Sequence, residues 1–193
     1  VYGLTPVSGS GSRETDPLHP DGDYAMSCLG RERVFTHFSQ ALGIPVALLR
    51  LNYATELRYG VLVDVGQQVA AGGEVDVTMG YLNSIWQGES NAMTLRAFDH
   101  VSSPPAVFNI AGPEKLSVRD VAERFAGRFG RPATIVGQEA CDALLSDGRS
   151  AYEALGRPVV MAKQMMDWIA AWLTCGGPTH GKPTHFQSRD GKF

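Results

Sequence analysis

The chain has 193 residues, of which 44% are hydrophobic and 19% are charged, a balance typical of folded globular proteins and not of disordered ones. Its 17 basic and 20 acidic residues give a net charge of -3 and form no basic run that would follow a phosphate backbone. Nucleic acid is therefore not an expected partner. No apolar run approaches the roughly 20 residues that cross a bilayer, so no membrane segment is expected either.

The three cysteines, Cys28, Cys141 and Cys175, are an odd number and form no CxxC pair. This pattern argues against a disulfide framework and indicates free thiols in a reducing, cytoplasmic setting. The chain opens at Val1 with the letters VYG, and we expect that a further segment precedes it.

The first third of the chain predicts a loop, a helix and a strand. Residues 5–23 are dense in Pro, Gly, Ser and Asp, which favour irregular backbone. A helix follows over 24–42 and ends at Gly43. The apolar side of this helix is formed by Leu29, Val34, Phe35, Phe38 and Leu42. Residues 44–53, IPVALLRLNY, form the continuous apolar run of a strand buried on both faces in a parallel sheet.

Helices and strands continue to alternate along the rest of the chain. We expect helices over 56–71, 87–100, 118–129, 141–156 and 162–177, and strands over 74–79, 104–112 and 133–137. Ser117 is the expected cap of the helix at 118–129. The inward stripe of that helix is formed by Val118, Val121, Ala122, Phe125 and Phe129. The tail at 178–193 has no period of its own, and the alternation as a whole predicts an α/β fold.

Tyr24 and Cys28 share one side of the first predicted helix. A free tyrosine has a pKa of about 10, so it exchanges protons at neutral pH only when a nearby cation or hydrogen bond favours the phenolate. A residue four positions later lies one helical turn away on the same side, where a lysine would supply that cation. The residue there is Cys28, which supplies no positive charge.

The order of several motifs resembles the extended short-chain dehydrogenase/reductase family, the NAD-dependent epimerases and dehydratases. VYG precedes a Pro- and Ser-rich loop and then YAMSCLGRE at 24–32, where the family carries Tyr-x-x-x-Lys. PVALLRLNYA is similar to the family strand that brings Arg and Asn beside the nicotinamide and the sugar, although Arg50 and Asn52 are one residue closer together than usual. Residues 107–131 and 144–160 are similar to the family's strand-to-helix stretch and closing segment.

The resemblance implies roles for individual residues. Tyr24 would be the catalytic acid/base, and Cys28 stands at the position of the catalytic lysine. Tyr24, Leu51 and Asn52 would contact NAD or NADP. Asn52 would also contact the substrate, a nucleotide sugar or similar hydroxylated metabolite. Without the resemblance, an asparagine that closes a turn is the simpler interpretation of Asn52.

Two arginines are further candidates for substrate binding. Arg58 and Arg96 carry planar guanidinium groups that suit a diphosphate. Each is also what a surface helix commonly carries. Arg31 lies seven residues after Tyr24, on the same side of the helix about two turns away. Its guanidinium can reach toward the phenol or a cofactor phosphate, but a solvated surface arginine is the interpretation favoured by sequence alone.

Two other groups of residues suggest sites less strongly. Cys175, His180 and His185 fit no closed zinc pattern, so no metal is expected. Trp168 and Trp172 lie four residues apart in an apolar helix, where packing in the core is a stronger interpretation than stacking on a sugar.

The resemblance also implies a domain organisation. We expect the C-terminal part of a Rossmann-like parallel sheet with helices, plus a small mixed α/β substrate domain. Residues 1–55 would belong to the NAD(P)-binding domain, with its first strands absent, and 56–193 to the substrate domain, with returns to the sheet at about 76–112. No Gly-x-x-Gly-x-x-Gly turn occurs to cradle a pyrophosphate. The missing N-terminal half of the same protein is therefore an expected partner, and a homodimer is a further expectation.

The resulting hypothesis is an NAD(P)-dependent epimerase/dehydratase-like protein that acts by hydride transfer and is incomplete in this chain. The alternative is a non-catalytic scaffold, or a binding or regulatory relative, that has lost the Tyr-Lys machinery. Cofactor titration of the longer protein distinguishes the two.

Overall fold

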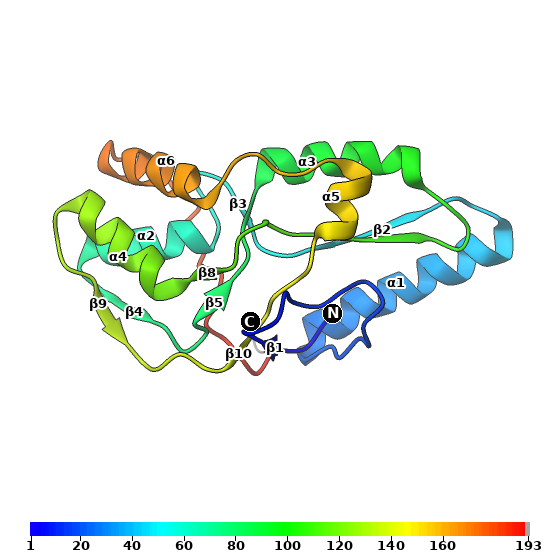
Figure 1. Cartoon of the computed structure of the whole chain (residues 1–193), viewed down its shortest axis with the longest axis horizontal. Helices are drawn as coiled ribbons and strands as arrows, with labels where there is room; N and C mark the ends of the chain where they lie inside the picture. The colour runs from blue at the N-terminus through cyan, green and yellow to red at the C-terminus, as the bar shows by residue number, and fades with distance from the viewer. Residues whose placement is uncertain (192–193) are drawn as a thin grey trace.

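A computed structural model describes residues 1–191 and contains two groups of helices joined by short strands (Figure 1). In one group the parallel pair β2 and β7 lies between α1 and a layer formed by α3 and α5. The bounds are Gly22–Leu42 for α1, Ala47–Leu51 for β2, Gln87–Arg96 for α3, Ala106–Ile110 for β7 and Arg149–Leu155 for α5. A 3-10 helix, η1 (Ala97–His100), continues α3. The predicted α/β fold with parallel pairing is confirmed.

Alternate side chains of β2 face opposite layers. Leu49 packs in the core shared with α3 and α5, whereas Arg50 faces α1 and binds Glu32 there. The predicted strand is confirmed, but its predicted burial on both faces is wrong: Ala47–Arg50 is half-buried and Leu51 is 56% exposed. Among residues 1–191, β7 is the ladder partner of β2, so one edge of β2 lies open.

Helix α1 confirms the helix predicted over 24–42 and ends at Gly43, which takes the left-handed conformation with φ of 65°. Its apolar side, however, faces outward. Val34, Phe35 and Phe38 are each more than half exposed, and Ser39 is the buried residue of the helix. The described part of the chain places no layer over this side.

The second group of helices, α2, α4 and α6, packs around its own core. The bounds are Val61–Ala71 for α2, Val118–Phe129 for α4, Ala162–Thr174 for α6, and Glu74–Asp76 and Thr134–Val136 for the parallel pair β4 and β9. Ser117 caps α4 as predicted, because its Oγ accepts a hydrogen bond from the backbone N–H of Asp120 at 3.2 Å. The predicted inward stripe of α4 lies in this core.

Short strands connect the two groups of helices. They are β1 (Thr5–Pro6) antiparallel to β10 (Asp142–Ala143), β3 (Ala54–Thr55) parallel to β6 (Ile85–Trp86), and β5 (Tyr81–Leu82) antiparallel to β8 (Leu116–Ser117). The irregular tail returns across this region, where Phe186 is 2% exposed and the Thr184 hydroxyl donates to the Asp64 carboxylate.

Two predicted helices begin later than their sequence pattern suggests. The helix predicted over 56–71 begins at Val61, after Gly60 adopts a φ of 128° that favours glycine. The helix predicted over 141–156 is wrong in its first half, because the chain there forms β10 and a turn before α5. Pairing with β1 overrides the local helical pattern.

The buried hydrophobic residues form two main clusters, one around β2, β7, α3 and α5 and the other around α2, α4 and α6. The expected domain boundary at residue 55 stays a prediction. Within residues 1–191, no helix is long and apolar enough to cross a membrane.

Candidate functional site

Tyr24 lies in the first turn of α1 and is 69% exposed. Its hydroxyl hydrogen-bonds with the Cys28 side chain one turn later, and the phenol also interacts electrostatically with Arg31 and Tyr59. Tyr59 belongs to the turn between β3 and α2. The phenol therefore lies beside the segment that follows the end of β2.

Cys28 raises the pKa of Tyr24 above the usual value of about 10. The only charge that a cysteine acquires is negative, and a negative neighbour disfavours the phenolate. The hydrogen bond to Cys28 and partial burial act in the same direction, while Arg31 opposes them. As the side chains stand, the phenol is a proton donor at neutral pH and a poor base.

Arg50, on β2, is held inside the protein. Its Nε and Nη2 donate to both oxygens of Glu32 at 2.9 to 3.3 Å, and its Nη1 donates to the Tyr2 hydroxyl at 2.6 Å. Burial opposes its charge, but these bonds to Glu32 and Tyr2 outweigh burial and raise the pKa of Arg50. The resemblance places an arginine near the ligand, whereas this guanidinium joins α1 to β2.

Asn109 is a buried polar residue of β7 that sequence reasoning did not single out as a site. It is fully buried, and its amide donates to the Ser12 carbonyl at 2.9 Å and accepts from the Tyr2 hydroxyl at 2.9 Å. Its backbone N–H donates to Glu14. The signal available in the sequence was an amide inside the apolar strand AVFNI.

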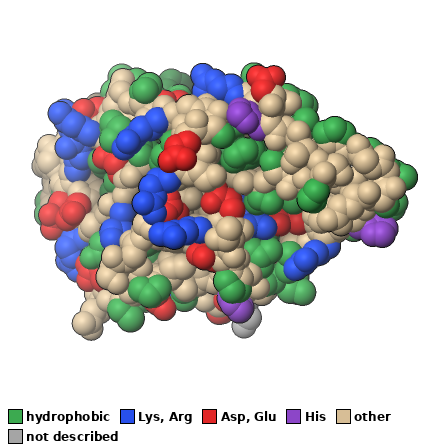
Figure 2. Space-filling view, turned by 45° about the vertical axis from the view of Figure 1, so that its right-hand side comes forward, with side chains coloured by type: hydrophobic (Ala, Val, Ile, Leu, Met, Phe, Trp, Pro, Cys, Tyr) green, Lys and Arg blue, Asp and Glu red, His purple; other side chains and the backbone are tan. Residues whose placement is uncertain are grey.

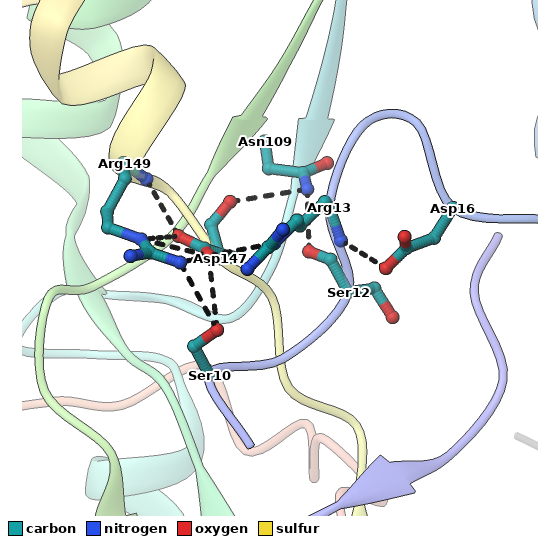
Figure 3. A network of polar contacts seen from close by, with 7 residues as sticks. All are labelled: Ser10, Ser12, Arg13, Asp16, Asn109, Asp147 and Arg149. Atoms are coloured by element: carbon teal, nitrogen blue, oxygen red, sulfur yellow. Dashed lines mark hydrogen bonds and ion pairs between the residues drawn. The ribbon is translucent and has the colours of Figure 1, made fainter.

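Asp147 is the centre of the polar network shown in Figure 3. Its carboxylate accepts hydrogen bonds from Arg149 Nε at 2.9 Å and from Ser10 Oγ at 3.2 Å, and it lies 3.7 Å from Arg13 Nε. The hydrogen bond from Arg149 is the largest cause of the lowered pKa of Asp147, and burial opposes it. The network joins the N-terminal loop to the segment before α5.

Asn52 follows β2 and contacts a second buried asparagine. Its Nδ2 donates to Asn83 Oδ1 at 3.5 Å, and its own Oδ1 accepts from the backbone of Tyr53 at 2.9 Å. Asn83 donates to the carbonyl of Glu114. Close packing surrounds these residues, since a Cβ at Gly112 would lie 1.9 Å from the Ser84 carbonyl oxygen. The bond from Tyr53 fits the simpler interpretation, in which Asn52 closes a turn. Asn52 also lies at the end of β2, where the resemblance places a ligand-binding asparagine.

The two arginines expected to bind substrate have separate protein partners. Arg58 pairs with Glu56 at 3.1 Å and its side chain is 53% exposed. Arg96, in the last turn of α3, donates to the carbonyl of Leu155 at 3.0 Å. Leu51, expected to contact cofactor, is exposed at the end of β2.

Two of the cavities formed by residues 1–191 are lined by neither Tyr24 nor Asn52. One of about 170 Å³ lies between α1 and the β2–β7 pair, against Glu32 and Arg50. The other, of about 280 Å³, lies beside β4 and β9. Among residues 1–191, no three His, Cys, Asp or Glu side chains are grouped so that they could hold a metal.

Charge is mixed over the face shown in Figure 2, where basic and acidic side chains alternate across the centre. Trp168 packs edge-on against Trp86 with ring centroids 5.2 Å apart, but it is 38% exposed, so its predicted place in the core is wrong.

Comparison with solved structures identifies the fold. The chain superposes on dTDP-glucose 4,6-dehydratase from Bacillus anthracis, solved with NAD, with a TM-score of 0.75 at 14% identity, over 91% of this chain and 59% of that one. RMD from Pseudomonas aeruginosa, solved with NADPH, gives 0.73 at 21% identity over 89% and 62%. UDP-glucuronic acid 4-epimerase from Bacillus cereus, solved with UDP-glucuronic acid and NAD, gives 0.73 at 16% over 90% and 60%.

The chain spans about 60% of the length of these structures. No protein-family model matches the sequence, and a search of curated proteins finds no match. The predicted resemblance to NAD-dependent epimerases and dehydratases is therefore confirmed at the level of the fold, over nearly the whole of this chain.

Proposed function

We propose that the chain is the C-terminal part of an NAD(P)-dependent epimerase/dehydratase-like protein that acts on a nucleotide sugar or a similar hydroxylated metabolite. The observation that carries the proposal is the exposed phenol of Tyr24 at the start of α1, in a chain with the fold of such enzymes. The Tyr24 side chain is 69% exposed and interacts electrostatically with Tyr59 in the segment after β3, and ligands of α/β sheets bind beyond the carboxyl ends of the strands.

In the proposed reaction, the Tyr24 phenolate would accept the proton of a substrate hydroxyl, and bound NAD(P) would supply the acceptor for the hydride of the same carbon. Leu51 and Asn52 would contact the nicotinamide and the sugar. Arg58 and Arg96 would contact a substrate phosphate, in place of the Glu56 carboxylate and the Leu155 carbonyl that they now contact.

The residues of this chain fit only part of an NAD(P) site. They would supply a phenol and an asparagine at the nicotinamide end, but the sequence contains no glycine-rich turn for the pyrophosphate. The cofactor would supply the hydride acceptor, and the remaining contacts would come from the rest of a longer protein.

The test uses that longer protein, a panel of nucleotide sugars and the absorbance of reduced NAD(P) at 340 nm. We expect reduction by at least one sugar, and a loss of roughly 10²-fold or more in Tyr24→Phe, since the substitution removes the acid/base group. Tyr81→Phe, on β5, is the matched control and keeps its activity. Equal rates in Tyr24→Phe and the parent protein would overturn the assignment.

A second candidate is a non-catalytic relative that binds ligands, and Cys28 is the observation that favours it. Cys28 raises the pKa of Tyr24, where catalysis needs it lowered. This candidate predicts cofactor binding with no reduction by any sugar, together with reduction in Cys28→Lys. Absence of reduction in both proteins would mean that the missing ammonium group is not the limitation.

A further inference from the structure

The first half of α1 carries a polar row on the side that holds Tyr24. Tyr24, Cys28 and Arg31 are spaced by four and three residues, so they follow one side of the helix. The contacts confirm the row: the Tyr24 hydroxyl bonds to the Cys28 side chain, and Arg31 Nη2 lies 3.8 Å from Cys28 Sγ. The guanidinium thus reaches the residue that stands between it and the phenol.

The direction of the helix favours this contact. Side chains on an α-helix lean toward its N-terminus, so a long side chain at position 31 extends back over the preceding turn and toward Tyr24. A guanidinium remains protonated at every pH at which a tyrosine titrates, and its positive charge therefore persists. A residue one turn after Tyr24 would lie closer, but Cys28 carries no positive charge.

Arg31 is also not committed to a carboxylate. Within residues 1–191, eight arginines form ion pairs with carboxylates, among them Arg50 with Glu32. Arg31 is not one of the eight. Its charge is one of the causes that act on the pKa of Tyr24, and it lowers that pKa against the effect of Cys28.

We propose that Arg31 is a positioning residue that supplies the positive charge beside the Tyr24 phenol, in the place of the lysine that Cys28 replaces. This inference rests on the proposed function for its role in catalysis. Arg31 is exposed, as the sequence interpretation of a surface arginine predicts, and the inference adds a role for its guanidinium. In this arrangement the Cys28 sulfur contacts the Arg31 guanidinium and keeps it on the side of α1 that carries Tyr24.

The groups that face this row define the controls. Tyr59 faces the phenol, and the amino group of Val1 and the carboxylate of Glu32 lie near Cys28. Burial lowers the pKa of the Val1 amino group below its usual value of about 8, so this group is neutral in the range in which the phenol titrates and does not compete with Arg31. Arg33, an exposed arginine of the same helix two residues away, is the matched control for loss of one positive charge.

The deciding experiment is the ultraviolet titration of the Tyr24 phenol in the 193-residue chain, isolated by subtracting the titration of Tyr24→Phe. We expect Arg31→Gln to raise the midpoint by roughly 0.3 to 1 pH unit, less than the 1 to 3 units of a closely paired charge, because the phenol is exposed. Arg31→Lys should restore only part of the shift, because a lysine with a pKa of about 10.4 loses its charge in the range in which the phenol titrates. Arg33→Gln should leave the midpoint unchanged, and circular dichroism at each pH verifies folding. An unchanged midpoint in Arg31→Gln, or an equal shift in Arg33→Gln, overturns the inference.

The longer protein separates this inference from the proposed function. If sugar-dependent reduction occurs, Arg31→Gln should move its pH profile to higher pH while Arg33→Gln does not, and an unmoved profile would contradict the role of Arg31. If no variant shows reduction, the proposed function fails. The phenol titration then still decides whether Arg31 supplies the charge.

Discussion

At the level of single residues, polar side chains inside apolar strands hold the two strands of the parallel pair in place. Arg50 binds Glu32 and Tyr2, and Asn109 binds Tyr2 and the Ser12 carbonyl. These groups can be buried because each has hydrogen-bond partners. An unpaired buried polar group lowers the free energy of unfolding by about 1 to 3 kcal/mol. The N-terminal loop supplies many of those partners, so it is structured by the strands that it covers.

The pH dependence of stability should contain a contribution from Asp147. Its pKa is lowered in the folded protein, chiefly by the hydrogen bond from Arg149. A lowered carboxyl pKa stabilises the fold fully above the unfolded pKa of about 3.9, and this stabilisation is lost as the pH falls through the folded value. We expect Asp147→Asn to lower the melting temperature at neutral pH and to approach the parent protein at acid pH.

Thermal melts of the parent protein and Asp147→Asn between neutral and acid pH measure this difference. Asp99→Asn, at an exposed position of η1, is the control and should follow the parent protein at every pH. A difference that stays constant as the pH falls would show that the carboxylate charge does not contribute.

At the level of elements, sequence periodicity predicted where helices begin and end better than it predicted which of their sides are buried. α4 has its predicted cap and buries its predicted stripe, because α2 and α6 in the same chain cover it. α1 has its predicted bounds, but its apolar side stays exposed. An apolar side predicted from the helical period is therefore buried only where other elements of the chain pack against it.

A pair of identical substitutions tests this contrast. Phe125 of α4 is fully buried and stacks on Phe129 with ring centroids 5.8 Å apart, whereas Phe38 of α1 is 51% exposed. We expect Phe125→Ala to lower the free energy of unfolding by about 3 to 5 kcal/mol, because it removes buried surface and leaves a cavity. Phe38→Ala should cost less than about 1 kcal/mol. Urea unfolding measures both, and equal losses would contradict the burial described here.

At the level of the whole molecule, an open strand edge and an exposed apolar helix side lie in the same group of elements. β2 has β7 as its ladder partner among residues 1–191, and α1 exposes Phe35, Phe38 and Leu42. Open edges and exposed apolar patches favour pairing with another chain. The expected partners, a preceding half of the same protein and a second copy of this chain, both remain predictions.

The chain by itself should self-associate through α1. We expect concentration-dependent association in sedimentation velocity, which Phe35→Glu combined with Phe38→Glu should reduce, because two carboxylates replace apolar contacts. Gln40→Glu, exposed on the same helix, adds charge without removing apolar surface and is the control. Association unchanged in the double variant would show that another surface is responsible.

The sequence by itself determined the α/β alternation, the bounds of α1 and α4, and the chemical identity of Tyr24 and Cys28, because helical period, capping residues and side-chain chemistry are local properties. Tertiary structure alone decided that 141–148 pairs with the N-terminal loop instead of forming a helix, that Arg50 binds Glu32, and that Asn109 joins the N-terminal loop to β7. These outcomes depend on which groups distant in sequence compete for the same partner, and no local pattern contains that information.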